Sequence, residues 1–290
     1  MSAGILEVAN AKINLSLDVR GREESGYHQL ESLVVFASVA DRVICKEADT
    51  LGLEISGPFA SQLANEDNNL ILKAARAFAG ALGRDPTVRF ELEKNLPIAS
   101  GIGGGSADAA AALRAMMRLW GDPPGSIEGI ALQLGADVPV CMRKRPSFMT
   151  GVGESLRTIR RFPEIHAVLA NPGVSVSTAD VFRRLQAGPV EGPERLPLLP
   201  GVETLDRLVI WLEENGNDLE APATAIEPVI KTVINELQET DGCRLARMSG
   251  SGATCFALYD NPFNSSEAAA ALKKKHNSWW VTATKFLGTQ

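Results

Sequence analysis

The chain has 290 residues, enough for two domains of ordinary size, and its 45% hydrophobic and 22% charged residues are typical of a globular protein. The formal net charge of −6 argues against a general nucleic-acid binder, which would carry a basic surface. The sequence shows neither an apolar run of membrane-spanning length nor a signal peptide, and its four cysteines lack zinc or redox spacing, so we expect a cytoplasmic protein.

The first third of the chain is predicted to consist mainly of β-strands. Ile13, Leu15 and Leu17 alternate with polar residues, which predicts a strand over 11–19. A helix is expected over 69–82, ended by Gly83, because its apolar residues recur at helical spacing. Further strands are expected over 30–40, 42–46, 51–55 and 87–92.

The rest of the chain mixes helices and strands without strict alternation, which favours an α+β fold. The segment 188–201 is rich in proline, which predicts a loop or linker. Helices are expected over 106–120, 126–134, 178–185, 205–214, 227–237 and 266–276, and strands over 147–158, 167–170 and 255–259.

A glycine-rich segment, PIASGIGGGSA at 97–107, precedes one of these helices. Glycines let the backbone adopt positive φ and bring its N–H groups close to an anion. The helix that starts near Ser106 adds unpaired N–H donors and the positive end of its dipole. A mobile hinge would also use glycines, but it does not explain a proline and a helix start so close on either side. We therefore predict a phosphate-binding loop.

Three common phosphate-binding patterns do not fit this segment. The P-loop requires Gly-Lys-Ser/Thr, and no lysine follows these glycines. The dinucleotide-binding pattern requires a third glycine where Ser106 stands. The His-Arg-Asp and Asp-Phe-Gly motifs of protein kinases are absent.

The segment does resemble the ATP loop of the galactokinase, homoserine kinase, mevalonate kinase and phosphomevalonate kinase superfamily. Residues 11–15 (AKINL) are similar to the first motif of that superfamily. Residues 248–256 (MSGSGATCF), with Gly250, Ser251 and Gly252, resemble the third, a turn that supports the phosphate loop. Segments at 26–28, 134–140, 151–154 and 171–174 resemble, within it, the 4-diphosphocytidyl-2-C-methyl-D-erythritol kinase family. These motifs keep the family's order and span nearly the whole chain.

The resemblance implies a two-domain α+β kinase. Residues 1–158 would form a domain like the second domain of ribosomal protein S5, with the ATP loop and the catalytic residues. Residues 159–290 would form a ferredoxin-like domain. The implied reaction is ATP-dependent phosphorylation of the 2-hydroxyl of 4-diphosphocytidyl-2-C-methyl-D-erythritol, in the non-mevalonate pathway of isoprenoid and terpenoid biosynthesis.

The expected partners are ATP, Mg²⁺ and this small cytidine diphosphate-linked substrate, with no nucleic acid and no membrane; the oligomeric state stays open. Two alternatives also stay open. One is a superfamily kinase that acts on mevalonate- or homoserine-type substrates. The other is a nucleotide-binding regulator that has lost catalysis.

Phosphoryl transfer needs a group that takes the acceptor proton and groups that neutralise charge. The resemblance assigns these catalytic roles to Asp137 and Lys12. Without it, Asp137 would be interpreted as a helix-cap or turn residue and Lys12 as a solvated strand lysine.

The resemblance places ATP against the glycine-rich segment and, on the adenine side, against three polar residues. Ala107 stands where the family often has a second serine, so Ser106 is left as the side-chain donor. No acidic residue is an evident magnesium ligand, and Mg²⁺ is expected to be held mainly by ATP, with Ser106 as the one candidate contact. The assigned ATP-binding residues are Pro97, Ile98, Ala99, Ser100, Gly101, Ile102, Gly103, Gly104, Gly105, Ser106, Ala107, Asn68, Asn69 and Lys94.

Five residues are assigned to the cytidine substrate by the same resemblance. Tyr27 and Phe182 would lie on opposite faces of the cytosine, and His28 at its edge. Thr178 and Asn14 would supply supporting contacts. Taken alone, Tyr27 and His28 are ordinary strand-start residues, and Phe182 would be interpreted as part of the core.

Overall fold

The computed structural model describes residues 4–63, 68–190 and 202–289, so most of the linker predicted over 188–201 lies outside the described residues. The chain divides into two compact units whose segments alternate along the sequence. Unit 1 contains Met1–Lys12, Val39–Ile98 and Gly103–Lys144, and unit 2 contains Ile13–Ser38, Ala99–Ile102 and Arg145–Gln290. The domain boundary expected at residue 158 stays a prediction.

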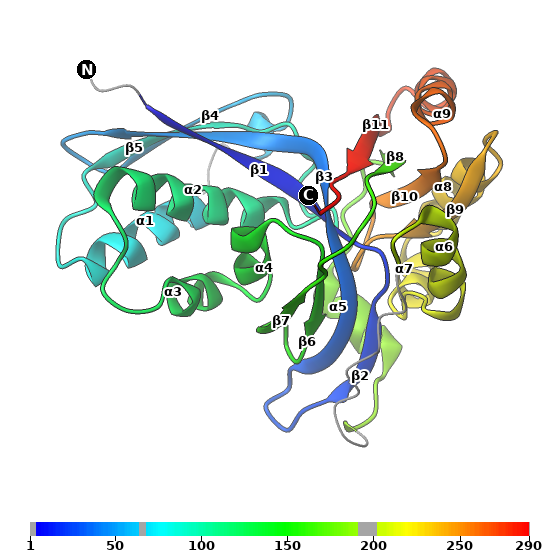
Figure 1. Ribbon diagram of the computed structural model, residues 1–290, viewed down its shortest axis with the longest axis horizontal. Helices are drawn as coiled ribbons and strands as arrows, with labels where there is room; N and C mark the ends of the chain where they lie inside the picture. Colours follow the sequence, from blue (N-terminus) through cyan, green and yellow to red (C-terminus); the bar gives the residue numbers. More distant parts are fainter. Residues whose placement is uncertain (1–3, 64–67, 191–201, 290) are drawn as a thin grey trace. The chain divides into compact units, whose positions relative to one another are not determined.

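Unit 1 is a sheet with helices on one face (Figure 1). Strand β4 (Gly52–Ser56) runs parallel to β5 (Val88–Glu93). Strand β5 is antiparallel to the second part of β3 (His28–Glu47). Strand β3 also pairs with β1 (Ile5–Asn14). Helices α1 (Leu70–Ala81) and α2 (Gly104–Trp120) cover the sheet, and the alternating burial of β5 directs its apolar side chains toward them. The short helices η1 (Ala60–Gln62), α3 (Ile127–Leu134) and α4 (Val138–Arg143) complete the unit.

Strand β3 corrects the sequence prediction. Separate strands over 30–40 and 42–46 were expected, but the structure has one strand of 20 residues. Asp41, which lies between the two expected strands, is fully buried and stays within β3 because its carboxylate has partners. Its Oδ1 accepts hydrogen bonds from the backbone N–H groups of Asn95 at 2.5 Å and Leu96 at 2.8 Å.

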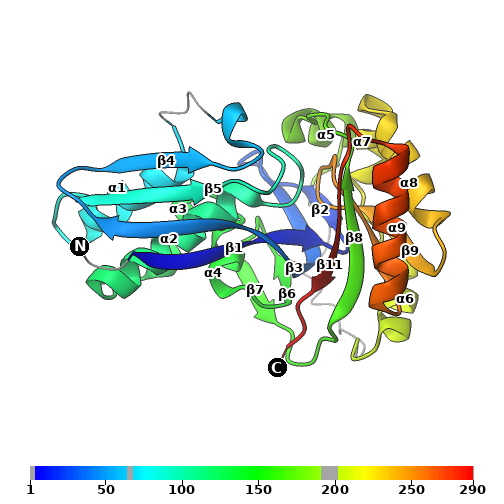
Figure 2. The same ribbon diagram turned by 90° about the horizontal axis from the view of Figure 1, so that it is seen from above.

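Unit 2 contains an antiparallel sheet in the order β11 (Trp280–Phe286), β8 (Ile165–Asn171), β10 (Cys255–Tyr259) and β9 (Cys243–Met248). Helix α8 (Val229–Gln238) precedes β9, and α9 (Pro262–Lys275) connects β10 to β11. Both helices lie along one face of these strands (Figure 2). This βαββαβ arrangement is that of the expected ferredoxin-like domain. Helices α5 (Thr178–Leu185), α6 (Leu205–Glu214) and α7 (Glu220–Ile226) lie between β8 and α8 in the chain.

The remaining strands of unit 2 flank the first part of β3. Strand β2 (Asp18–Arg22) and strand β6 (Ser147–Thr150) both pair with it, and β6 forms a hairpin with β7 (Ser155–Thr158). The single strand expected over 147–158 is therefore wrong, because Gly151 and Gly153 take positive φ and turn the chain. The strand expected over 11–19 likewise divides between β1 and β2.

The α+β class is confirmed, and each helix predicted from its periodicity is present, with ends that agree with the prediction to within four residues. Helices α4 and α7 and strands β9 and β11 were not predicted. Within the described ranges, the structure has no helix with the length and apolar character needed to cross a bilayer.

Candidate active site

The glycine-rich segment has the backbone geometry of an anion-binding loop. Gly101 and Gly103 both adopt the left-handed conformation, with φ of +74° and +62°, which side chains disfavour. Gly103 is the N-cap of α2, and it has no side chain to accept from the helix. The first N–H groups of α2 therefore keep their hydrogen-bonding capacity and the positive end of the helix dipole for an incoming group.

In unit 2, the third motif packs against the first half of this loop. The Ser249 hydroxyl donates to the carbonyl of Gly101 at 3.1 Å, and the Thr254 N–H donates to the carbonyl of Ser100 at the same distance. A Cβ on Gly101 would lie 2.5 Å from the carbonyl oxygen of Ser249. The backbone of Gly101 therefore packs so closely on the backbone of the third motif that there is no room for a side chain. This contact holds the first half of the loop in place.

In unit 1, Lys12 and Asp137 form an ion pair beside the second half of the loop. The Lys12 Nζ lies 2.7 Å from the Asp137 Oδ2. The Lys12 side chain is only 5% exposed, whereas that of Asp137 is 33% exposed and can still be reached by another molecule. A Cβ on Gly103 would lie 3.2 Å from the Cβ and Cε of Lys12, so the loop glycine packs directly on the lysine stem.

Asp137 occupies the N-cap position of α4, but its side chain makes no capping hydrogen bond. Asp137 therefore stands at a helix-cap position, but its carboxylate does not cap the helix and instead contacts Lys12. Pro139, at the start of α4, needs no hydrogen-bond acceptor for its nitrogen, which favours a helix start here. The short helix thus leaves the carboxylate available for chemistry.

Lys94 is buried in unit 1 and contacts two carboxylates. Its Nζ lies 2.8 Å from the Asp108 Oδ2 and also contacts the Asp41 Oδ2. Burial opposes the charge of Lys94, but the charges of Asp108 and Asp41 outweigh it and raise the pKa of the lysine. Burial raises the pKa of Asp108 to about 7, and Lys94 opposes that shift.

The other residues assigned to the adenine side are Asn68 and Asn69. Asn68 is exposed. Asn69 is the N-cap of α1, where its Oδ1 accepts a hydrogen bond from the Ile71 N–H at 2.9 Å. This oxygen accepts one hydrogen bond and has a second lone pair, so an adenine contact of Asn69 could use either this oxygen or the Nδ2 group.

The residues assigned to the cytidine substrate lie in unit 2. The rings of His28 and Phe182 are stacked with centroids 4.5 Å apart, while Tyr27 is 66% exposed. Thr178 begins α5, and its hydroxyl lies 2.8 Å from that of Ser251 in the third motif. Burial and the charge of Arg22 lower the pKa of His28, which keeps its ring neutral near pH 7.

Asn14 is buried in the same unit, with 1% of its surface exposed. Its Nδ2 donates to the Ser32 hydroxyl at 2.7 Å, whereas its Oδ1 has no hydrogen-bond partner among the described residues. A buried acceptor without a donor is costly, which is consistent with an oxygen that is available to a ligand donor.

Sequence reasoning missed Asp41, Asp108 and Ser249 as parts of this region. Asp108 had a detectable signal, because it is the single carboxylate in the alanine-rich start of α2. Asp41 had none, since its partners lie more than 50 residues away in the chain.

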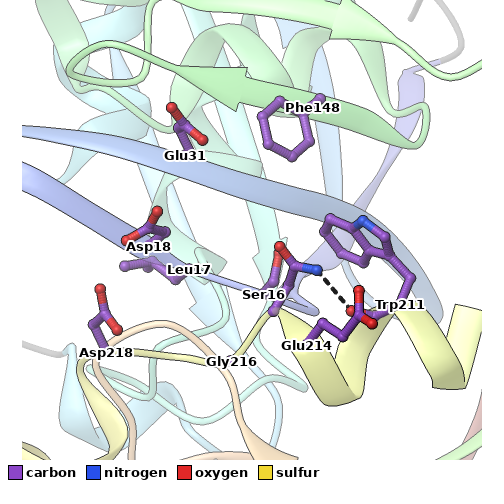
Figure 3. A pocket seen from close by; sticks show the side chains of 10 residues that line it. Ser16, Leu17, Asp18, Glu31, Phe148, Trp211, Glu214, Gly216 and Asp218 are labelled. Atoms are coloured by element: carbon purple, nitrogen blue, oxygen red, sulfur yellow. Dashed lines mark hydrogen bonds between the residues drawn. The ribbon is translucent and has the colours of Figure 1, made fainter. Parts of the chain in front are cut away.

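A separate cavity of about 250 Å³ lies in unit 2 (Figure 3). The cavity is lined by carboxylates and aromatic side chains, and by none of the site residues predicted from the sequence; the carboxylates are Asp18, Glu31, Glu214 and Asp218. Burial and the neighbouring Asp18 raise the pKa of Asp218. Carboxylates repel phosphate groups, so the cavity is unsuited to either of the expected anionic substrates.

The described part of the chain contains no group of three His, Cys, Asp or Glu side chains that could hold a metal ion. At the start of α2 the available side-chain oxygen is that of Ser106, which is half-buried. This donor set fits an ion that keeps most of its oxygen ligands from water and a triphosphate.

Two family models match the chain. The model described as GHMP kinases N terminal domain matches residues 69–145, and the one described as GHMP kinases C terminal matches residues 198–278. The first match runs from α1 to α4 and includes the glycine-rich loop and Asp137.

Relatives of similar length share about half of the sequence. A 4-diphosphocytidyl-2-C-methyl-D-erythritol kinase of Parvibaculum lavamentivorans is 50% identical over 285 residues, which cover 97% of this chain and 98% of that protein. The protein of the same name from Rhodospirillum rubrum is 44% identical, with 98% and 93% covered.

Solved structures agree with these matches. A crystal structure of 4-(cytidine 5′-diphospho)-2C-methyl-D-erythritol kinase superposes with a TM-score of 0.80 at 35% identity and covers 98% of this chain and 100% of its own. Homoserine kinase from Cytophaga hutchinsonii has a TM-score of 0.70 at 18% identity, with 100% and 96% covered, which shows a shared fold. The two-domain kinase fold expected from the sequence is confirmed.

Proposed function

This chain belongs to the 4-diphosphocytidyl-2-C-methyl-D-erythritol kinase family of the GHMP kinases, and we propose that it transfers the γ-phosphate of ATP to the 2-hydroxyl of 4-diphosphocytidyl-2-C-methyl-D-erythritol. The observation that carries the catalytic assignment is the Lys12–Asp137 ion pair, packed on a glycine of the loop. The proposed product is an intermediate of the non-mevalonate route to isoprenoids.

The acceptor end of the reaction is assigned to the ion pair. Asp137 accepts the proton of the substrate hydroxyl, while Lys12 keeps the carboxylate oriented through its 2.7 Å contact. The hydroxyl oxygen forms a bond to the γ-phosphorus as the bond from that phosphorus to the β–γ bridging oxygen breaks. ADP leaves with the electron pair of that bond.

The donor end is assigned to the loop. The N–H groups at the start of α2 bind phosphate oxygens, and Gly101 and Gly103 let the backbone approach without Cβ atoms in the way. Magnesium would be held chiefly through ATP, with Ser106 as the candidate side-chain contact, and would supply charge neutralisation along the triphosphate.

The substrate is recognised by residues of unit 2. Tyr27 and Phe182 offer apolar ring faces to the cytosine, and the neutral His28 ring offers a donor and an acceptor to its edge. The unpartnered Asn14 Oδ1 accepts from a substrate donor group, and Thr178 adds a hydroxyl contact. Because His28 stacks on one face of Phe182, a cytosine between Tyr27 and Phe182 would have to use the other face of Phe182 or displace His28.

The proposed partners are small molecules, ATP and the cytidine compound, and the proposed location is the cytoplasm. The TM-score of 0.70 to homoserine kinase shows a shared fold, and the 18% identity does not favour homoserine as substrate. The pair Lys12–Asp137 is intact, which argues against an inactive regulator.

A coupled ADP-release assay tests this proposal. The purified chain should release ADP with the diphosphocytidyl substrate and not with mevalonate or homoserine. Asp137→Asn should lower kcat by a factor of about 100 or more, since loss of a general base typically costs that much. Asp122→Asn makes the same chemical change at an exposed residue of unit 1 and should leave kcat unchanged.

Two outcomes would contradict the proposal. Equal turnover with mevalonate would overturn the substrate assignment. An Asp137→Asn variant that works at close to the wild-type rate would remove Asp137 from the mechanism.

A further inference from the structure

Three charged side chains are buried together beneath the start of α2. Asp41 is 0% exposed, Lys94 is 2% exposed and Asp108 is 4% exposed. They come from β3, from the residue after β5 and from the second turn of α2, so tertiary structure alone brings them together. We call Asp41, Lys94 and Asp108 the buried triad.

The buried triad contacts both ends of the glycine-rich loop. At the entry, the Asp41 Oδ1 accepts from the N–H groups of Asn95 and Leu96, immediately before Pro97. At the exit, Lys94 contacts Asp108, which lies five residues after the N-cap Gly103. One ammonium and two carboxylates therefore connect the residues that enter the loop to the helix that leaves it.

Gly104 also depends on this arrangement. Its φ is not in the left-handed region, so backbone conformation does not explain why a glycine stands there. A Cβ at this position would lie 3.1 Å from the Lys94 Nζ and 3.9 Å from the Asp41 Oδ2. The buried triad thus packs directly beneath the first helical residue of the loop.

Stability alone is a poor explanation for burying these charges. Desolvation of an ion pair often cancels its attraction, and apolar residues of similar volume usually serve a core equally well. The arrangement also leaves the Asp108 Oδ1 buried without a hydrogen-bond partner among the described residues, which is a further cost. A polar network retained at such cost fits a task in which geometry matters more than stability.

We propose that the buried triad is a positioning network that holds both ends of the loop in the geometry that binds nucleotide. Lys94 then acts on ATP through the backbone of the loop and not by touching the phosphates, because its ammonium faces two carboxylates inside unit 1. This inference rests on the proposed function insofar as the loop binds ATP.

Direct titration with ATP tests the inference on the full chain without turnover. Three variants should each raise the dissociation constant for ATP by about threefold or more, because each frees one end of the loop. These variants are Asp41→Asn, Asp108→Asn and Lys94→Met. The affinity for the diphosphocytidyl substrate should change by no more than about twofold. Each variant is first shown to be folded at the assay temperature by its thermal unfolding curve.

Glu7→Gln is the matched control. Glu7 is a largely buried carboxylate of unit 1 that pairs with Arg114 at 2.9 Å and with Arg118 at 3.0 Å, near the far end of α2. Loss of the Glu7 charge should lower the midpoint of thermal unfolding, as the triad variants should, but it should leave the affinity for ATP unchanged. Equal ATP affinity in the triad variants and in Glu7→Gln would reduce the triad to a structural role and overturn the proposal.

Asp108→Asn also separates positioning from direct contact. If Lys94 bound phosphate itself, removal of a competing carboxylate would strengthen ATP binding or leave it unchanged, whereas positioning predicts weaker binding. This variant keeps the Asp41–Lys94 pair, so it serves even if Lys94→Met does not fold. A wild-type chain that binds ATP but does not phosphorylate the cytidine compound would refute the proposed function and leave the triad inference standing.

Discussion

Replacing Gly101 with alanine tests how the loop is built. The new Cβ would lie 2.5 Å from the Ser249 carbonyl oxygen and 2.7 Å from that of Gly252. Neither contact can be relieved by moving a flexible side chain, because both atoms belong to backbone. The residue would also have to hold φ near +74°.

The expected cost follows from these two effects. An alanine in the left-handed region costs about 1–2 kcal/mol, and forced overpacking adds about 1–3 kcal/mol. We therefore expect the free energy of unfolding to fall by about 2–5 kcal/mol, a large part of the roughly 5–15 kcal/mol of a typical domain. ATP affinity should fall as well, since the loop must shift to admit the methyl group.

Urea unfolding followed by circular dichroism measures the stability change, with an unchanged m-value as the check on comparability. Gly80→Ala is the control, because Gly80 lies in α1 without positive φ, and a methyl group added there would meet no heavy atom within 4 Å other than those of its chain neighbours and the backbone of its own helix. It should stabilise the chain by about 0.5–1 kcal/mol. If Gly101→Ala unfolds within about 0.5 kcal/mol of wild type, a range usual for neutral surface changes, the close packing of the loop on the third motif is wrong.

Two further predictions concern titrating side chains. Burial and the charge of Arg22 lower the pKa of His28 below its ordinary 6.5. The stability that this histidine contributes is therefore present above pH 6.5 and is lost as the pH falls through the lower pKa of the folded chain. The free energy of unfolding, plotted against pH for wild type and for His28→Asn, should diverge in this window and differ by a constant amount above it. Burial raises the pKa of Cys45 and Cys141 to about 12, so a thiol reagent should label the native chain slowly. Cys243 should react first because it is only partly buried, and all four cysteines should react rapidly in urea. Rapid labelling of all four cysteines in the native chain would contradict their burial.

The sequence predicted those parts of the fold that depend on local pattern. Helix α6 and strand β10 begin and end where apolar spacing indicated, at Leu205–Glu214 and Cys255–Tyr259. The continuity of β3 could not be predicted, because Asp41 resembles a strand break unless its distant partners are known. Strand β11 was missed for a related reason, since its seven pairings with β8 are made far along the chain.

The candidate site divides in the same way. The glycine loop could be recognised from its own residues, because conformational freedom and a helix start are local properties. The roles of Lys12 and Asp137 came from a family resemblance, and the 2.7 Å contact between them is a tertiary fact that neither segment encodes alone. The buried triad was not foreseen, because each of its members has an ordinary appearance in its own segment.

The alternation of the two units along the chain limits how this enzyme can change during evolution. Residues 13–38 belong to the same unit as Arg145–Gln290, and Ala37 on β3 pairs with Phe286 on β11. A genetic crossover near codon 158 would therefore combine residues 159–290 from one parent with residues 13–38 from the other, although both segments belong to unit 2 and their strands pair. New acceptor preferences are then more readily acquired through single substitutions in place than through exchange of whole gene segments.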